Sequence, residues 1–404
     1  MLINDVSKKL IYPFWSDCIK LYEMGLGNVE DIDKVCELGL GHPKGPFKLI
    51  DEMGLDVFYK ELKIFYEKTK DRRYKVPELL IKMVRKGYIG KKIKKGFYDY
   101  INTVNRSKDN DVLQVSSISR QIKKVGVIGF GSMGRGIVQV VAGAGFKVIV
   151  RETDDVFLQK GMNFIDKMLN IGVEKKKITE REKTDIINRI EGTTSFEALK
   201  DSDIVIEAVF EKLDLKKEIF AQIDKIVRPD AVLATNTSCL SVSEISTATK
   251  RPDKVCGLHF FNPVPLMRLV EIIRGAHTSD ETLKKVVSFS IALGKEPVEC
   301  KDSPGFIANR ILCPYLFHAI REYESGLATK EEIDNSIKLA TGFPMGPLAL
   351  TDLIGLDICL DIGELIFKAT GDSSLKPPSL LGEMVKSGLL GKKSGKGFYS
   401  YSLM

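Results

Sequence analysis

A histidine and a glutamate stand twelve residues apart, at His259 and Glu271, within a run of aromatic and aliphatic residues. A proline-containing turn separates two apolar runs typical of β-strands, Val255–Phe260 and Leu269–Ile273. Such a turn would return the Glu271 carboxylate to the side of the imidazole. An imidazole held by a buried carboxylate can serve as a general base near neutral pH. A purely structural ion pair in the core is the alternative, and the rest of the chain decides between the two.

A glycine-rich turn lies between two further expected strands. Lys124–Gly129 is predicted to be a short buried strand, and Gly129-Phe-Gly-Ser-Met-Gly134 leads from it into a helix that ends near Ala144. The next strand is expected at Lys147–Val150. Three glycines of this spacing, placed between a strand and a helix, are typical of dinucleotide-binding proteins.

Each glycine of the turn has a distinct expected role. Gly129 permits the tight turn, Gly131 lets the backbone approach a pyrophosphate, and Gly134 lets helix and strand pack closely. The backbone amides that are expected to be free to face the phosphates belong to Phe130, Ser132 and Met133. A packing turn without a ligand is the alternative.

The acid that selects the cofactor is expected at the end of the following strand, about 20 residues after the glycine turn. The chain has Arg151-Glu152 there. Glu152 is expected to bind the adenosine ribose hydroxyls, whereas Arg151 could accommodate a 2′-phosphate. The sequence favours NAD over NADP.

Other polar residues follow two more expected strands, Ile204–Glu207 and Ala231–Thr235. Glu207, Glu211 and Asn236 fall at or beyond the carboxyl ends of these strands, which is where open α/β sheets bind ligands. Solvated loop side chains are the alternative for any one of them.

Composition places few limits on the function. The chain has 404 residues, of which 44% are hydrophobic and 28% charged, as in soluble globular proteins. A net charge of +7 without a nucleic-acid motif gives little support for a nucleic-acid partner. The seven cysteines are dispersed and form no CxxC pair, so neither zinc nor a disulfide framework is indicated. No membrane helix or signal segment is apparent, and we expect a cytoplasmic protein.

An internal repeat brackets these motifs. Gly25–Tyr98 aligns without gaps to Gly326–Tyr399 at an offset of 301, with about 30 of 74 positions identical. Apolar residues recur at helical spacing in both copies, so each is predicted to be a small all-helical domain. His42 is expected to pack in a loop where the other copy has Phe343, and His318 is expected on the surface of a long helix.

Together these patterns predict an α/β Rossmann-type domain with a doubly wound parallel sheet, flanked by two all-α helical domains. The expected boundaries are a helical domain at 1–101, a linker at 102–123, the nucleotide-binding domain at 124–302 and a second helical domain at 303–404.

The motifs in combination resemble the L-3-hydroxyacyl-CoA dehydrogenases of fatty-acid β-oxidation and related short-chain acyl-CoA pathways. The segments that carry the resemblance are Gly129–Gly134, Glu207–Glu211, Asn236–Ser238, His259–Glu271, Ser303–Arg310 and Gly391–Tyr399. Residues 1–101 resemble an additional copy of the family's C-terminal helical domain.

The resemblance implies a role for each matching residue. His259 would take the proton of the substrate's 3-hydroxyl group, and Glu271 would orient and charge-balance it. Ser238 and Asn309 would hydrogen-bond the reacting oxygen and the thioester region. The residues implied to hold the nicotinamide half of NAD are Glu211, Lys216, Asn236 and Lys393. No metal is implied.

The implied reaction is the reversible, NAD-dependent oxidation of an (S)-3-hydroxyacyl-CoA, with a short-chain substrate such as 3-hydroxybutyryl-CoA. The basic run Lys175–Lys177 could meet the CoA phosphates, and Cys239 is expected to be a spectator where the family commonly has a second serine. A dehydrogenase of a non-CoA hydroxy acid and a catalytically inactive NAD-binding relative are the alternatives.

The N-terminal copy departs from the family where the active site would be. Lys8 stands where the C-terminal copy has Asn309, so no active site is expected in it. We expect this copy to act as a built-in partner for the C-terminal copy, in a chain that is a monomer or a homodimer.

Overall fold

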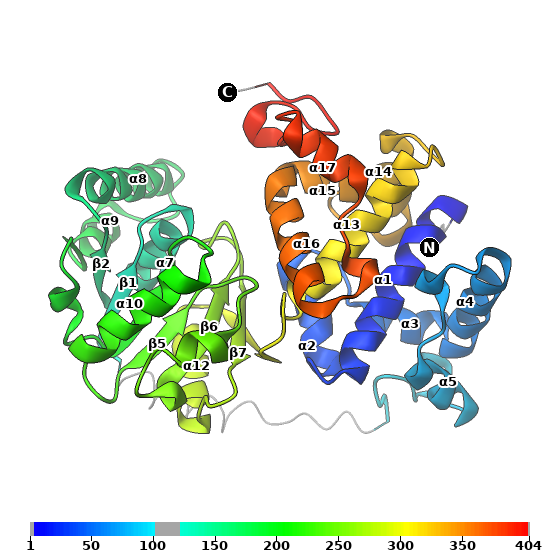
Figure 1. The fold of residues 1–404 in the computed structure, drawn as a ribbon, viewed down its shortest axis with the longest axis horizontal. Helices are drawn as coiled ribbons and strands as arrows, with labels where there is room; N and C mark the ends of the chain where they lie inside the picture. Colours follow the sequence, from blue (N-terminus) through cyan, green and yellow to red (C-terminus); the bar gives the residue numbers. More distant parts are fainter. Residues whose placement is uncertain (1–3, 102–121, 403–404) are drawn as a thin grey trace. The chain divides into compact units, whose positions relative to one another are not determined.

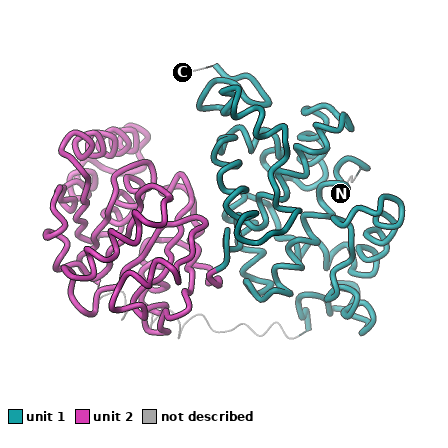
Figure 2. Tube along the Cα trace, viewed as in Figure 1, with its two compact units in different colours: residues 1–104, 303–404 teal, residues 105–302 magenta. Residues whose placement is uncertain are grey.

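The computed structural model describes residues 4–101 and 122–402 (Figure 1). Two compact units result: the sheet unit, residues 105–302, and the helical unit, residues 1–104 with 303–404 (Figure 2). The expected linker at 102–123 falls mostly outside the described residues. Its last two residues belong to the sheet unit, because Ile122 is buried there and the Lys123 amide donates to Asp203 Oδ2 at 2.7 Å. The two helical segments, distant in sequence, share one unit.

The sheet unit is built on eight strands in the order β3-β2-β1-β4-β5-β6-β7-β8. Their bounds are β1 (Lys124–Ile128), β2 (Lys147–Arg151), β3 (Ile190–Thr193), β4 (Ile204–Glu207), β5 (Val232–Thr235), β6 (Val255–Phe260), β7 (Leu269–Arg274) and β8 (Glu296–Lys301). Neighbouring strands are parallel except β6 and β7. The order reverses between β1 and β4, and open α/β sheets bind ligands outside the carboxyl ends of the strands at such a point. The predicted α/β fold is confirmed, with one antiparallel pair in its sheet.

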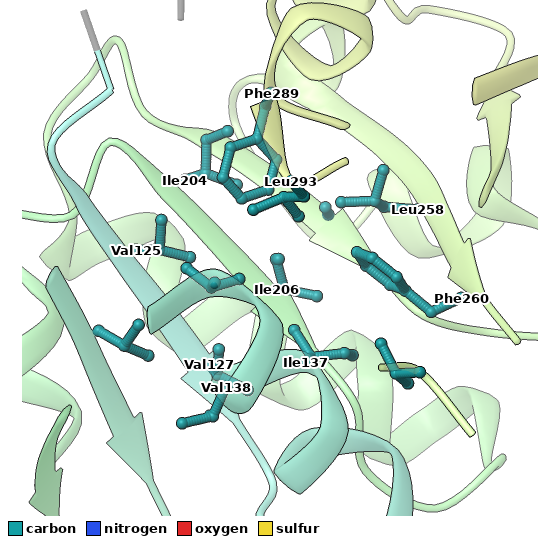
Figure 3. Close-up of a cluster of buried hydrophobic side chains, with 14 of the residues drawn as sticks. Val125, Val127, Ile137, Val138, Ile204, Ile206, Leu258, Phe260, Phe289 and Leu293 are labelled. Atoms are coloured by element: carbon teal, nitrogen blue, oxygen red, sulfur yellow. The ribbon is translucent and has the colours of Figure 1, made fainter. Parts of the chain in front are cut away.

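Helices cover both faces of this sheet. They are α7 (Ser132–Gly143), α8 (Asp155–Glu174), α9 (Glu180–Ile187), α10 (Leu213–Ile226), α11 (Val242–Ser246) and α12 (Asp280–Ala292), with short 3-10 turns η4 (Phe196–Leu199) and η5 (Pro252–Lys254). Every residue of β4 is buried, as expected for a central parallel strand with both faces covered. Figure 3 shows alternate residues of β1 and β4, among them Val125 and Ile206, packed with Ile137 of α7 and Phe289 of α12.

The helical unit contains two copies of one arrangement. The first comprises α1 (Asp5–Glu23), α2 (Val29–Lys34), η1 (Val35–Gly39), α3 (Pro46–Met53), α4 (Leu55–Thr69), η2 (Arg72–Tyr74), α5 (Glu78–Arg85) and η3 (Lys91–Ile93). The second comprises α13 (Ala308–Glu324), α14 (Lys330–Thr341), α15 (Pro347–Ile354), α16 (Leu356–Thr370), η6 (Ser373–Leu375), α17 (Ser379–Lys386) and η7 (Lys392–Ser394).

A buried aspartate explains much of the repeated sequence. Asp33 accepts hydrogen bonds from the Phe47 amide in the first turn of α3 and from the Tyr98 hydroxyl, both at 2.8 Å. Gly45 is required beside it, because a Cβ there would lie 2.2 Å from the Asp33 carboxyl carbon. Asp334 makes the same contacts in the second copy. These side chains fasten the chain end of each copy to its helices.

The two copies pack with α1 of the first copy against α13 and α14 of the second. This contact corrects one expectation: His318 of α13 is 1% exposed and so does not lie on the surface. The helical pattern of α13 alone could not show that a second copy covers this side. His42 does pack in its loop as expected, stacked on Phe343 with ring centroids 3.4 Å apart.

Candidate active site

His259 and Glu271 are direct partners across the antiparallel pair β6 and β7. His259 Nδ1 lies 2.8 Å from Glu271 Oε2, and the carboxylate side chain is fully buried. An ionised carboxylate can only accept, so the hydrogen in this bond sits on Nδ1. The neutral imidazole then presents the lone pair of Nε2. The strand pairing predicted from the proline-containing turn places these two groups together.

Ser238 meets the other nitrogen of the imidazole. Its Oγ lies 3.1 Å from His259 Nε2. Ser238 follows β5, so neighbouring strand ends deliver the hydroxyl and the imidazole to the same edge of the sheet. The hydrogen-bonded series therefore runs from Ser238 through His259 to Glu271.

Glu211 holds the turn that carries Ser238. Its Oε1 accepts the amide hydrogen of Ser238 at 2.8 Å and that of Cys239 at 3.1 Å, and also the Thr237 hydroxyl. Its Oε2 lies 3.3 Å from Lys216 Nζ. The carboxylate thus acts on the position of the serine through the backbone.

Lys216 and Glu207 form a buried ion pair behind this turn. Lys216 Nζ lies 2.7 and 3.0 Å from the two carboxylate oxygens of Glu207, and the side chains are 1% and 0% exposed. The Thr235 hydroxyl also donates to Glu207, at 2.7 Å. Thr235, the last residue of β5, and Thr237, two residues further on, were not predicted as site residues, although alternate residues of an extended chain lie on the same face.

Asn236 supports the strand that carries the histidine. Its Oδ1 accepts the backbone amide of Phe260 at 2.9 Å, and the residue is 8% exposed. This bond ties the end of β5 to the end of β6. The NH₂ group of the same carboxamide takes no part in this bond and can donate other hydrogen bonds.

The glycine turn has the shape that a dinucleotide needs. Gly129 has φ +94°, and a Cβ at Gly134 would lie 1.9 Å from the Gly129 carbonyl oxygen. A Cβ at Gly131 would instead meet nothing within 4 Å. The first and third glycines are therefore required by the fold, whereas the second leaves open space beside the first turn of α7, which begins at Ser132 and Met133. NAD fits this turn.

Glu152 lies beside the glycine turn, as expected of the ribose-binding acid. However, its Oε2 accepts the Phe130 amide at 2.7 Å, and its Oε1 accepts the Thr153 amide at 2.6 Å. The expectation that the Phe130 amide is free to face a phosphate is therefore wrong for this structure. The Phe130 side chain is buried, and its ring lies over Gly161, where a Cβ would come within 2.1 Å of it.

Arg151 is held on the side of β3. Its Nε donates to the Thr194 carbonyl at 3.2 Å, and its guanidinium lies over the Phe196 ring, 4.1 Å from the centroid. Burial lowers the pKa of this guanidinium. These contacts occupy one edge and one face of the group that could otherwise serve a 2′-phosphate.

Two predicted site residues belong to the helical unit. Asn309 stands in the first turn of α13 and is 8% exposed. Lys393 lies in η7, with its Nζ 2.5 Å from Asp357 Oδ2. Lys175–Lys177, the candidate for CoA phosphates, lies exposed just beyond α8. The site roles of these residues remain predictions.

Two kinds of site are not found in the described parts of the chain. Residues 4–101 and 122–402 contain no group of three or more histidine, cysteine or acidic side chains that could hold a metal ion. Within the same ranges, none of the helices combines the length and apolar character needed to cross a membrane.

Both units of the chain match models of one protein family. The NAD-binding domain model of 3-hydroxyacyl-CoA dehydrogenase matches residues 124–303. The C-terminal domain model of the same enzyme matches twice, at residues 6–100 and 305–401. The second match to one domain model is what the internal repeat predicts, because residues 1–101 resemble an additional copy of that domain.

Individual relatives agree. A 3-hydroxybutyryl-CoA dehydrogenase of Clostridioides difficile is 45% identical over 69% of this chain and 99% of the relative. The human mitochondrial hydroxyacyl-coenzyme A dehydrogenase is 44% identical over 69% of this chain and 91% of its own length. The crystal structure of (S)-3-hydroxybutyryl-CoA dehydrogenase from Ralstonia eutropha is 45% identical, with a TM-score of 0.68 over 70% of this chain and all of that one. The chain belongs to the 3-hydroxyacyl-CoA dehydrogenase family.

Proposed function

We propose that this protein catalyses the reversible, NAD-dependent oxidation of an (S)-3-hydroxyacyl-CoA to the 3-ketoacyl-CoA. A short-chain substrate, such as 3-hydroxybutyryl-CoA, is favoured because relatives that are called 3-hydroxybutyryl-CoA dehydrogenases align with this chain over almost their whole length. The observation that carries the proposal is the hydrogen-bonded series Ser238–His259–Glu271 at the carboxyl edge of the sheet.

The proposed base is His259. Oxidation of the alcohol requires that the hydroxyl proton leave as C3 loses its hydride, and Nε2 is the basic atom that faces outward from the Glu271 pair. The proton ends on Nε2, and the adjacent carboxylate stabilises the imidazolium that forms. When bound, NAD supplies the hydride acceptor.

Ser238 is the proposed partner of the reacting oxygen. Its hydroxyl lies within hydrogen-bond distance of His259 Nε2, so a 3-hydroxyl group placed against the imidazole also meets Ser238. Asn309 is proposed to contact the same oxygen or the thioester. Both residues would hold the alcohol in line for hydride loss, which is a positioning contribution.

The cofactor is proposed to lie along the glycine turn. Gly131 provides the open approach, the first turn of α7 provides amide donors, and Glu152 would bind the adenosine ribose. The residues proposed for the nicotinamide half are Glu211, Lys216, Asn236 and Lys393. Because the Lys216 ammonium lies against Glu207 and Glu211, we assign to it an indirect effect on the cofactor.

The remaining assignments concern the organisation of the chain. We assign the redox chemistry to residues 124–302, further substrate contacts to residues 303–404, and a non-catalytic partner role to residues 1–101. A cytoplasmic location is proposed, in keeping with seven buried cysteines. The internal pairing of the copies is compatible with a monomer or a homodimer.

A spectrophotometric assay tests the proposal. NADH oxidation is followed with acetoacetyl-CoA, with longer 3-ketoacyl-CoAs and with free acetoacetate as the non-CoA control. We expect turnover with the CoA thioesters and a kcat/KM for free acetoacetate that is lower by orders of magnitude. Equal kcat/KM for the free acid would contradict the CoA assignment, and no turnover of any substrate would contradict the enzyme assignment.

A further inference from the structure

Three contacts between the two copies join residues that are equivalent in the repeat. His42 stacks on Phe343, Phe14 packs on Tyr315 with ring centroids 5.3 Å apart, and Asp17 Oδ2 lies 3.9 Å from His318 Nε2. The members of each pair are 301 positions apart. A residue that touches its own equivalent must lie close to a local two-fold axis that relates the copies.

Reciprocal contacts on either side of these pairs fit the same axis. A Cβ at Gly41 would meet Pro344 at 3.3 Å, and a Cβ at Gly342 would meet Pro43 at 3.3 Å. Gly41 and Gly342 are equivalent positions, and so are Pro43 and Pro344. The backbone of the interface is therefore nearly symmetric.

The side chains on the axis are not symmetric, although the backbone is. An aspartate faces a histidine, and a histidine faces a phenylalanine. If two N-terminal copies paired in the same way, Asp17 would face a second Asp17. The ion pair of Asp17 with Lys20, at 2.8 Å, lies within the N-terminal copy and would keep a charged carboxylate on each side of such a contact. Two such carboxylates in a buried contact would repel each other.

Polar contacts away from the axis are one-sided as well. Arg73 Nη2 lies 3.0 Å from Glu322 Oε1, and Asn4 Nδ2 donates to Ser336 Oγ at 3.1 Å. The equivalents of Arg73 and Glu322 are Ser374 and Leu21, so this ion pair has no mirror image. In a pair of N-terminal copies Arg73 would keep only Asp71 of its own copy, 2.7 Å away, and in a pair of C-terminal copies Glu322 would lose Arg73.

We propose that the N-terminal copy is specialised to recognise the C-terminal copy and to reject a second copy of itself. The side chains that face each other at the axis differ between the copies, and the Arg73–Glu322 pair is one-sided. The face is therefore complementary only when the two different copies meet. Each chain then supplies its own partner at this face, and this property does not depend on the proposed reaction.

Substitutions in the full chain test the axial pair. His318→Asp places a second carboxylate opposite Asp17, and Asp17→His places a second imidazole opposite His318. The exchange Asp17→His/His318→Asp restores an unlike pair. Unfolding of the helical unit can be followed by the fluorescence of Trp15, which is buried in α1 and is the single tryptophan of the chain. The control is Asp361→His, the same change at an exposed position of α16.

We expect each single substitution to lower the unfolding midpoint by about 3 °C or more, and the exchange to recover most of that loss. The control should leave the midpoint unchanged. If the unfolding midpoint of the exchange variant falls by the sum of the two single losses or by more, the two residues are not coupled and the axial argument is overturned.

Cleavage of the full chain tests the selectivity itself. A protease site is introduced within residues 102–121, the purified protein is cut, and the masses of the native species are measured. The cut protein is then mixed with a tagged version, so that exchanged species can be resolved. We expect only complexes in which one N-terminal piece joins one C-terminal piece. Complexes of two N-terminal or two C-terminal pieces would overturn the proposal.

Discussion

The Ser238 amide donates a hydrogen bond of 2.8 Å to Glu211 Oε1, so a carboxylate from the end of one strand fixes the turn that follows another. The same oxygen accepts the Cys239 amide, and the other oxygen faces Lys216. The position of the Ser238 hydroxyl beside His259 therefore depends on the Glu211 carboxylate, which acts through the backbone amides and not through the imidazole.

Glu211→Gln tests that dependence. The carboxamide retains one acceptor oxygen, but it replaces charge-assisted bonds with weaker ones and meets the Lys216 ammonium with no negative charge. A loss of about 1.4 kcal/mol in the transition state corresponds to a tenfold fall in rate, so we expect kcat to drop about tenfold. Glu218→Gln, on the exposed side of α10, is the matched control. Steady-state kinetics that show the same kcat for both variants would refute the positioning role.

Two glycines of the turn should respond in opposite ways to the same change. Gly134→Ala forces a Cβ to within 1.9 Å of a carbonyl oxygen, so it should destabilise the sheet unit by several kcal/mol. Gly131→Ala meets open space and should leave the unfolding midpoint unchanged, but it should weaken NAD binding about tenfold or more because the methyl group occupies the approach to the pyrophosphate. Thermal unfolding and NADH-binding titrations distinguish the two effects. Unchanged affinity in the Gly131→Ala variant would place the cofactor elsewhere.

Cofactor preference should depend on Glu152. A carboxylate beside the turn can bind the ribose diol and repels a 2′-phosphate, while Arg151 is engaged by Thr194 and Phe196. We expect the wild type to prefer NAD and Glu152→Gln to lower the NAD-to-NADP ratio of kcat/KM about tenfold. A ratio that does not change would mean that the carboxylate only holds the Phe130 amide, to which it is bonded at 2.7 Å.

Lys295 should make the stability of the His259–Glu271 hairpin depend on pH. Its ammonium donates to the carbonyls of Val264 and Met267 in the connecting turn, and burial lowers its pKa to about 8 from 10.5. Between these two values the unfolded chain binds more protons than the folded one, so stability rises with pH. The contribution of Lys295 is thus complete above about pH 10.5 and is lost as the pH falls through about 8.

Lys295→Met removes this group and leaves the chain length of the side chain similar. The unfolding free energies of both proteins are measured by urea denaturation. We expect the wild-type value minus the variant value to increase from pH 7 to pH 9.5. A difference that stays constant over this range, or decreases, would show that Lys295 titrates as it does in the unfolded chain.

Much of this fold follows from local sequence patterns. The strands at Ile204–Glu207 and Val255–Phe260 were predicted with their observed bounds, because short β-branched runs between polar residues identify buried strands. The contact of His259 with Glu271 was predicted for a related reason: a short turn between two strands fixes their register.

The features that were predicted wrongly or not predicted depend on contacts between distant parts of the chain. The burial of His318 requires the other copy, which no periodicity within α13 reveals. The capture of the Phe130 amide by Glu152 requires the side-chain geometry of two strand ends. Lys295 follows a helix as an ordinary charged residue would, and only the fold shows its ammonium capping two carbonyls.

The turnover of a His259→Gln variant tests the central claim most directly. Glutamine can still hydrogen-bond to Glu271 but cannot take up the hydroxyl proton, so kcat with acetoacetyl-CoA and NADH should fall about 10²–10⁴-fold. NADH affinity and the unfolding midpoint should stay near the wild-type values. His277→Gln, at an exposed histidine of the same unit, is the control and should be fully active. A His259→Gln enzyme that is folded, binds NADH and turns over at the wild-type rate would contradict the account.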